Sequence, residues 1–291
     1  MALHAGPSAW FDLLAALGDL TFVTHVSGAT LGWCGDAPRF DHTDWPVLPA
    51  SRTWPYAPNL AEFARLWALR EIDATGVRHL LAVQNTPGAV FHRIIVPPGP
   101  GSDRLLAFIE RHQLPPDRTR PWFPPNHARA AERHACVHQR IPWLQSRWAA
   151  RSPRIRRLSL VQTLDLLAAA VSHAQPLRTM LYSEPLICGT AWIPERIVAE
   201  PRPASPLPPS PHASRKLPWR LRLFGGASGL ELLPHLIGSA WLWMDQCACC
   251  QRSRWAVEIG GIDDRLILAL LATHDTTEPA WRRFLRTTLD G

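Results

Sequence analysis

Four short stretches of the chain combine apolar residues with helix-forming neighbours and predict helices. In one of them Leu105, Phe108 and Ile109 fall on one face of the predicted helix, as the 3.6-residue period requires. The four stretches are DLLAALG from Asp12, DRLLAFIERH from Asp103, SLVQTLDLLAAAVSHA from Ser159 and EPAWRRFLRTTL from Glu278.

Between these helices lie short apolar segments that end at turn signals and predict strands. LTFVTHV and LRTMLYS each follow a predicted helix. RHLLAVQNTPGAVFHRII (from Arg78) and RWAVEIGGIDDRLILALL (from Arg254) each hold two apolar runs around a glycine-containing turn. Hairpins at this spacing favour antiparallel sheet, so we expect an α+β fold.

Two sets of motifs recur along the chain at nearly equal spacing. Seventeen residues separate DLLAA at residues 12–16 from Cys34-Gly35, and 18 residues separate DLLAA at residues 165–169 from Cys188-Gly189. A fixed internal period is typical of repeated structural units. We therefore predict a tandem structural repeat, each copy an antiparallel sheet with flanking helices, over residues 1–114 and 138–291, joined by a connector over residues 115–137.

A proline-rich insert lengthens the second copy. PRPASPLPPSPHASRKLP, residues 201–218, contains seven prolines. Proline fixes φ and lacks an N–H, which excludes helix and central strand. We expect an exposed, semi-extended loop and assign no site to it.

Composition and charge narrow the class of protein. The 291-residue chain is 46% apolar and carries a net charge of +7, and Lys216 is its one lysine among 31 basic residues. The arginines are scattered among 24 acidic residues rather than gathered in a stripe, which argues against nucleic-acid binding. The amino terminus lacks the features of a signal peptide, and no run of about 20 residues is free of charge and proline, so we expect a cytoplasmic protein without a membrane span.

The cysteines and the glycine-rich segment do not match a known motif for metal or phosphate. Cys247, Cys249 and Cys250 lie within CACC, but no second pair stands at zinc-site spacing, which favours reduced thiols. FGGASG, residues 224–229, lacks the Gly-Lys-Ser/Thr ending of a phosphate loop and indicates a turn.

Three segments together resemble a known family. HLLAVQNTPGAVFHRIIV, LDLLAAAVSHAQPLRTMLYSEPLICGTAW and EPAWRRFL are similar to segments of the HemS/ChuS-type cytoplasmic haem-trafficking and haem-degrading proteins, which are tandem repeats. The resemblance covers most of the chain and implies haem as the cofactor.

The stretch CVHQRIPWLQSRWAAR, residues 136–151, resembles the start of that family's second copy. The family has a histidine, a leucine six residues on and an arginine thirteen residues on, and here these positions hold His138, Leu144 and Arg151. The resemblance implies that His138 is the axial ligand of the haem iron and that Arg151 contributes to the haem pocket. Imidazole is a common axial ligand, and a guanidinium can pair with a propionate.

The same stretch also departs from the family pattern. Arg140-Ile141 replaces a pair of aromatic residues, and Cys136 replaces an acidic one. His127 and His134 lie a few residues upstream, and either could serve as the ligand if the register is shifted.

The resemblance implies a protein that receives, buffers or delivers haem, together with a haem-uptake or haem-degrading partner protein. The alternatives are a haem-degrading, oxygenase-like enzyme that takes electrons from a partner, and a degenerate repeat that acts by protein interaction. A carrier is favoured over an enzyme because the sequence holds no G-x-G-x-x-G after a strand and no three cysteines at the spacing that a radical cluster requires.

Overall fold

The computed structural model describes residues 1–4, 7–36, 56–58, 63–73, 76–85, 88–114, 156–183, 186–201, 217–246, 253–263, 265–273 and 276–290. Its helices are α1 (Pro7–Leu17), α2 (Pro100–His112), α6 (Leu160–Ser172), the 3₁₀ turn η3 (Pro234–Leu236) and α7 (Glu278–Asp290). The four predicted helices are therefore confirmed.

The strands of the first half of the chain are β1 (Ala2–Leu3), β2 (Asp19–Val26), β3 (Ala29–Asp36), β4 (Tyr56–Pro58), β5 (Phe63–Asp73), β6 (Gly76–Asn85) and β7 (Val90–Val96). Those of the second half are β8 (Arg156–Leu158), β9 (Leu177–Tyr182), β10 (Leu186–Trp192), β11 (Arg196–Glu200), β12 (Arg220–Gly225), β13 (Ser228–Leu232), β14 (Ile237–Gln246), β15 (Ser253–Gly261) and β16 (Leu266–Ala272).

These strands form two sheets, and every pair whose register is defined runs antiparallel. One sheet has the order β1-β5-β6-β7-β2-β3-β13-β12-β11 and the other the order β4-β10-β9-β16-β15-β14-β8. The predicted hairpins are β6–β7 and β15–β16, and FGGASG forms the β12–β13 turn, where Gly226 has a φ of +53° that favours glycine. The α+β class with antiparallel sheets is thus confirmed.

The chain forms two compact units. Unit 1 comprises Met1–Val26, Gly32–Trp143 and Tyr182–Gly189, and unit 2 comprises Ser27–Leu31, Leu144–Leu181 and Thr190–Gly291. The order helix, strand, strand occurs as α1-β2-β3 and again as α6-β9-β10, with one DLLAA motif in each helix. The repeat boundaries at residues 114 and 138 stay a prediction.

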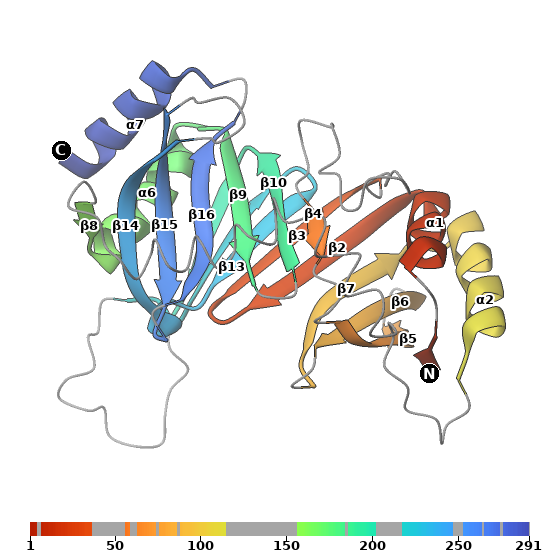
Figure 1. Cartoon of the computed structure of the whole chain (residues 1–291). Coiled ribbons are helices and arrows are strands. Elements are labelled where there is room, and N and C mark those ends of the chain that lie inside the picture. The colour runs from red at the N-terminus through yellow and green to blue at the C-terminus, as the bar shows by residue number, and fades with distance from the viewer. Residues whose placement is uncertain are drawn as a thin grey trace. The chain divides into compact units, whose positions relative to one another are not determined.

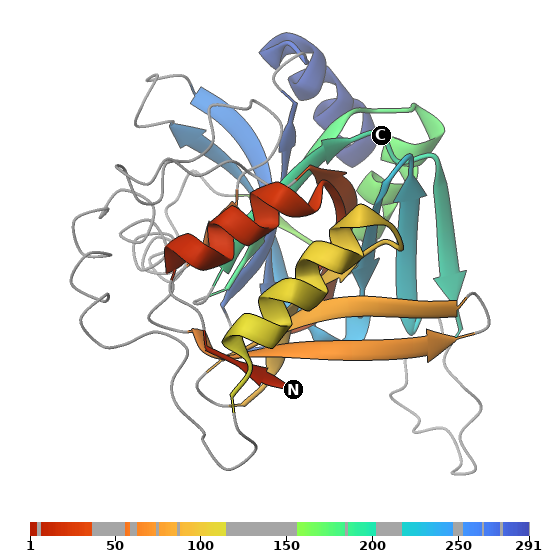
Figure 2. The same ribbon diagram turned by 90° about the vertical axis from the view of Figure 1, so that its right-hand side faces the viewer.

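In unit 1, α1 and α2 lie side by side, as both views show (Figures 1 and 2). Trp10 and Leu14 of α1 and Leu105 of α2 are completely buried. Gly101 permits the close approach of the two helices, because a Cβ there would stand 2.6 Å from the carbonyl oxygen of Leu17. Of the apolar stripe predicted for α2, Leu105 is completely buried, and Phe108 and Ile109 are partly buried.

In unit 2, α6 begins with a capping box. The Ser159 hydroxyl accepts a hydrogen bond from the Gln162 backbone N–H at 3.1 Å, and the Gln162 side chain accepts one from the Ser159 N–H at 2.9 Å. This pair satisfies two backbone donors at the start of the helix. In Figure 1, α6 lies behind strands β14, β15 and β16.

The proline-rich insert connects two paired strands. Glu200 at the end of β11 stands opposite Arg220 at the start of β12, and the Trp219 N–H donates to the Glu200 carbonyl oxygen at 2.8 Å. Residues 202–216 themselves lie outside the described residues. The insert therefore extends a hairpin connection.

Each helix that the structure describes is too short or too polar to cross a lipid bilayer.

Candidate functional site

The residues predicted to hold haem lie outside the described part of the chain. His138 and Arg151 fall in the stretch 115–155, as do the alternative ligands His127 and His134. The CACC cysteines at 247, 249 and 250 also lie outside it. The description of the chain resumes at Arg156, the first residue of β8 and five residues after Arg151. The sheet that contains β8 is therefore the first described element after the predicted haem residues.

The register of the seven-stranded sheet separates its two faces. Directly opposite residues of antiparallel strands point to the same side. One such row runs Leu242, Val257, Leu270 and Thr179 across β14, β15, β16 and β9, and the last three are completely buried. Leu242 lines the same cavity as Leu285 of α7, so this face packs against the helices.

The opposite face carries a different set of side chains. One row runs from β8 to β9 through Arg157, Trp241, Glu258, Ala269 and Met180, and the next holds Trp243, Ala256, Leu271 and Arg178. We call these nine residues the tryptophan face.

The tryptophan face combines flat aromatic area with cationic groups. Trp241, Trp243 and Arg178 are each partly buried, and the guanidinium carbon of Arg157 lies 5.8 Å from the centroid of the Trp241 ring. A guanidinium at that distance over an indole forms a cation–π contact. The face therefore brings aromatic rings and guanidinium groups together on one side of the sheet.

A carboxylate lies in the same row. Glu258 is 5% exposed and stands between Trp241 and Ala269. A carboxylate this far from water needs polar partners, and Glu258 does interact with other groups of the chain. Because of Glu258, the tryptophan face carries an acidic group as well as its arginines.

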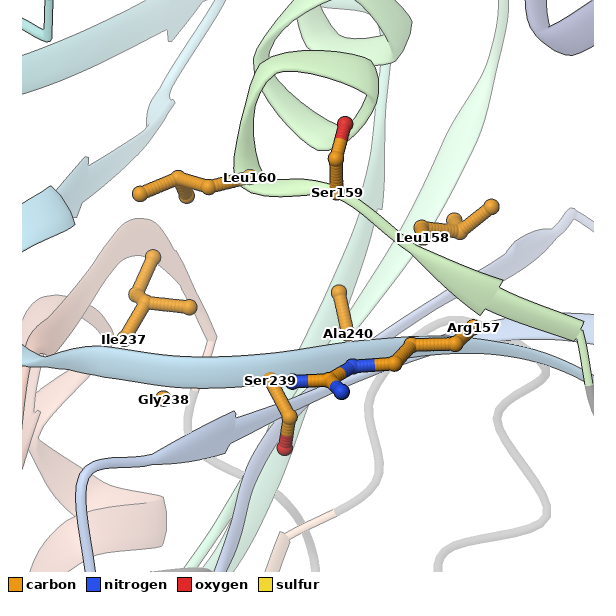
Figure 3. A pocket seen from close by; sticks show the side chains of 8 residues that line it. All are labelled: Arg157, Leu158, Ser159, Leu160, Ile237, Gly238, Ser239 and Ala240. Atoms are coloured by element: carbon orange, nitrogen blue, oxygen red, sulfur yellow. The ribbon is translucent and has the colours of Figure 1, made fainter.

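A cavity of about 380 Å³ opens where β8 and the start of α6 meet the start of β14 (Figure 3). Figure 3 shows the Arg157 side chain extending along β14 toward Ser239. Ser239 stands opposite Gly260 and so belongs to the same side as Trp241; its hydroxyl is buried without a hydrogen-bond partner. Buried polar atoms are usually hydrogen-bonded, so a donor or acceptor is missing there.

The strand is bulged at this cavity. The β14–β15 register shifts between Ile237 and Ser239, and a Cβ on Gly238 would stand 2.5 Å from the Gly261 carbonyl oxygen. Only glycine fits at this approach of two backbones. A bulge re-aims the neighbouring side chains, here that of Ser239.

Unit 1 holds a buried polar cluster that the sequence analysis missed. Thr24 Oγ1 and His92 Nδ1 are 2.8 Å apart, and Thr24, His92 and Cys188 are all completely buried. Burial, followed by the charge of His25, lowers the pKa of His92 to about 3. Burial raises the pKa of Cys188 to about 12. A hydrogen bond with the Thr24 side chain has a smaller, opposite effect on this pKa. An inaccessible neutral imidazole and a neutral thiol suit a structural role better than ligand binding.

No group of three or more His, Cys, Asp or Glu side chains with the geometry of a metal site occurs among the residues that the structure places. The tryptophan face instead suits an organic ligand, and an axial ligand for haem iron would have to come from another part of the chain. The aromatic surface of the tryptophan face fits the apolar ring of haem, and the guanidinium groups of this face fit the haem carboxylates.

No family model matches the chain, and neither does any curated protein. Solved structures, in contrast, do match the chain. ChuS, a haem oxygenase of E. coli, aligns with 99% of this chain and 88% of its own at 13% identity, with a TM-score of 0.74. Holo-PhuS, a haem-binding protein from Pseudomonas aeruginosa, aligns with 98% of this chain and 86% of its own at 17% identity, with a TM-score of 0.70. The resemblance seen in the sequence is thus confirmed in three dimensions, and the chain has the fold of ChuS and PhuS over nearly its whole length.

Proposed function

We propose that this chain binds haem on the tryptophan face of unit 2, with His138 as the axial ligand of the iron and Arg151 beside the macrocycle. The observation that carries the proposal is the tryptophan face itself, on a fold shared with a haem oxygenase and a haem-binding protein. The His138 and Arg151 assignments rest on the family resemblance of residues 136–151.

The side chains of the face supply the contacts that haem requires. The indoles of Trp241 and Trp243 offer apolar area to a porphyrin ring. Arg157 and Arg178, at opposite ends of the two rows, offer guanidinium groups to carboxylates. Guanidinium–carboxylate pairs are directional and bidentate, so these arginines would orient the propionates as well as attract them.

Covalent geometry supports a place for Arg151 near this face. Arg151 stands five residues before Arg156 of β8 in the sequence, and five residues span at most about 18 Å when fully extended. Arg157, the next residue, belongs to the tryptophan face. His138 is 18 residues before Arg156, and that separation sets no useful limit. A neutral imidazole would bind iron through one nitrogen while the other is held by an acceptor.

Within haem handling, we favour reception, buffering or delivery in the cytoplasm, in exchange with a haem-uptake or haem-degrading partner protein. Neither a nicotinamide nor a flavin motif occurs in the sequence, so reducing equivalents for degradation would have to come from another protein. Haem degradation is the second candidate, because ChuS is a haem oxygenase.

The test is a haem titration of the apo chain followed by visible absorption. We expect a saturable Soret band at one haem per chain, and weaker binding by Trp241→Ala and by Arg157→Gln. Arg196→Gln is the matched control, because Arg196 makes a similar cation–π contact at 4.8 Å with Phe224 on β11–β12, away from this face. No saturable band, or equal losses for Arg157→Gln and Arg196→Gln, would contradict the proposal.

Delivery and degradation are separated by a second step. Addition of a reductant under air should leave the Soret band of a carrier in place, whereas an oxygenase-like enzyme should lose it together with the macrocycle. Stable absorption over many equivalents of reductant supports the carrier, and progressive bleaching to an open-chain product supports the enzyme.

A further inference from the structure

A second cavity lies on the opposite, helix-packed side of the same sheet. It has a volume of about 300 Å³ and is formed by α7 together with residues of β8, β14 and β15. We call it the α7 pocket. Its lining combines three arginines with a cluster of apolar side chains, which is unusual for a cavity that only separates a helix from a sheet.

One arginine of the α7 pocket is already held by the fold. Arg156 forms an ion pair with the carboxylate of Asp290, and its other terminal nitrogen donates to the Leu289 carbonyl oxygen at 3.1 Å. Asp290 is the one acidic residue of the lining, and Arg156 neutralises it.

The other two arginines have no such partner. Arg282 and Arg286 are exposed on one side of α7 and form no ion pair with any carboxylate of the described chain. They stand at i and i+4, where like charges repel and destabilise a helix. An anion between them would relieve that repulsion.

Trp255 adds an aromatic ring to the lining of the α7 pocket. The guanidinium carbon of Arg282 lies 5.7 Å from the centroid of that ring. A guanidinium at that distance forms a cation–π contact, which places the Arg282 head group beside the pocket.

The remainder of the lining is apolar. Leu242 of β14 and Leu285 and Leu289 of α7 form it, and the two α7 leucines are 3% and 8% exposed. A small, highly hydrated anion such as free phosphate would gain nothing from these side chains. A ligand with an apolar body and one anionic head suits both parts of the lining.

We propose that the α7 pocket binds a small amphiphilic carboxylate, whose head lies at Arg282 and Arg286 and whose apolar body lies against the Trp255 ring and the three leucines. This site is independent of haem binding on the tryptophan face, because the two sides of the sheet carry different side chains.

Calorimetric titration of the apo chain with octanoate tests the proposal, with 1-octanol as a neutral probe of the same tail. Octanoate should bind at one site, and octanol at least about tenfold more weakly, because charge-assisted hydrogen bonds are lost. Arg286→Gln and Arg282→Gln should each weaken octanoate binding about tenfold or more.

Arg283→Gln is the matched control, because Arg283 is an exposed arginine of the same helix that does not line the α7 pocket. It should leave the octanoate affinity unchanged. Circular dichroism of each variant reports whether α7 still folds. Equal binding of octanol and octanoate, equal loss in Arg283→Gln and Arg286→Gln, or no octanoate binding to the folded wild-type chain would each overturn the proposal. The haem titration is a separate measurement, so failure here leaves the haem proposal standing.

Discussion

Protonation of His92 should destabilise the chain as the pH falls. The imidazole of His92 in β7 is completely buried and its Nδ1 lies 2.8 Å from the Thr24 hydroxyl. Its ring also stacks at 6.0 Å from Phe22 and 6.4 Å from Phe91. Burial is the largest cause that lowers its pKa to about 3, and the charge of His25 adds to it.

The direction and size of the effect follow from linkage. The unfolded chain, with a histidine pKa of about 6.5, binds a proton between pH 6.5 and pH 3 while the folded chain does not. The free energy of unfolding therefore falls as the pH falls through that window, and the contribution of neutral His92 is fully present above it. At about 1.4 kcal/mol for each pH unit, the loss between pH 6.5 and pH 5 is about 2 kcal/mol.

Urea unfolding at pH 7 and pH 5 measures this loss. His92→Gln removes the titrating group and keeps a polar side chain beside Thr24. Between the two pH values the wild type should lose about 2 kcal/mol more than His92→Gln, since carboxylate titrations are common to both. His173→Gln, at an exposed histidine near the end of α6, is the control and should retain the wild-type dependence. If His92→Gln shows the same dependence on pH as the wild type, the reasoning is refuted.

Three further perturbations address packing and connections. Leu105→Ala, at a completely buried residue of α2, should lower the free energy of unfolding by about 2–5 kcal/mol, whereas Leu106→Ala, at a residue 41% exposed, should cost under about 1 kcal/mol; equal effects in urea unfolding would show that α2 packs differently. Ser159→Ala removes the hydroxyl of the α6 capping box and should cost about 1 kcal/mol in the same assay, and no loss would mean that the box contributes nothing. Deletion of residues 202–216 should leave the thermal midpoint nearly unchanged, because Glu200 and Arg220 already pair at the base of the hairpin; a large drop would show that the insert is packed.

Local patterns predicted the helices and hairpins because their causes are local. The apolar runs of β15 and β16 and the GGIDD turn between them lie within twenty residues, so one stretch of sequence specifies the pairing. The position of β3 beside β13 could not be predicted in this way, since these strands are about 200 residues apart and local periodicity carries no information on distant neighbours.

The tryptophan face shows the same limit. The alternation Trp241-Leu242-Trp243 would have placed both indoles on one face of a strand, but only the register with β8 and β15 brings Arg157 and Glu258 beside them. His92 likewise appears in the sequence as one histidine in the hairpin strand VFHRIIV, and its burial depends on β2.

The central claim, that the chain binds haem through His138, is tested most directly by the visible absorption spectrum of haem-loaded His138→Ala. Imidazole forms a coordinate bond to iron, whereas a guanidinium offers no lone pair. His138→Ala should therefore lose the histidine-ligated spectrum and most of the affinity, and Arg151→Ala, His127→Ala and His134→Ala should each keep that spectrum. A wild-type spectrum from His138→Ala would contradict the assignment and move the ligand to another residue.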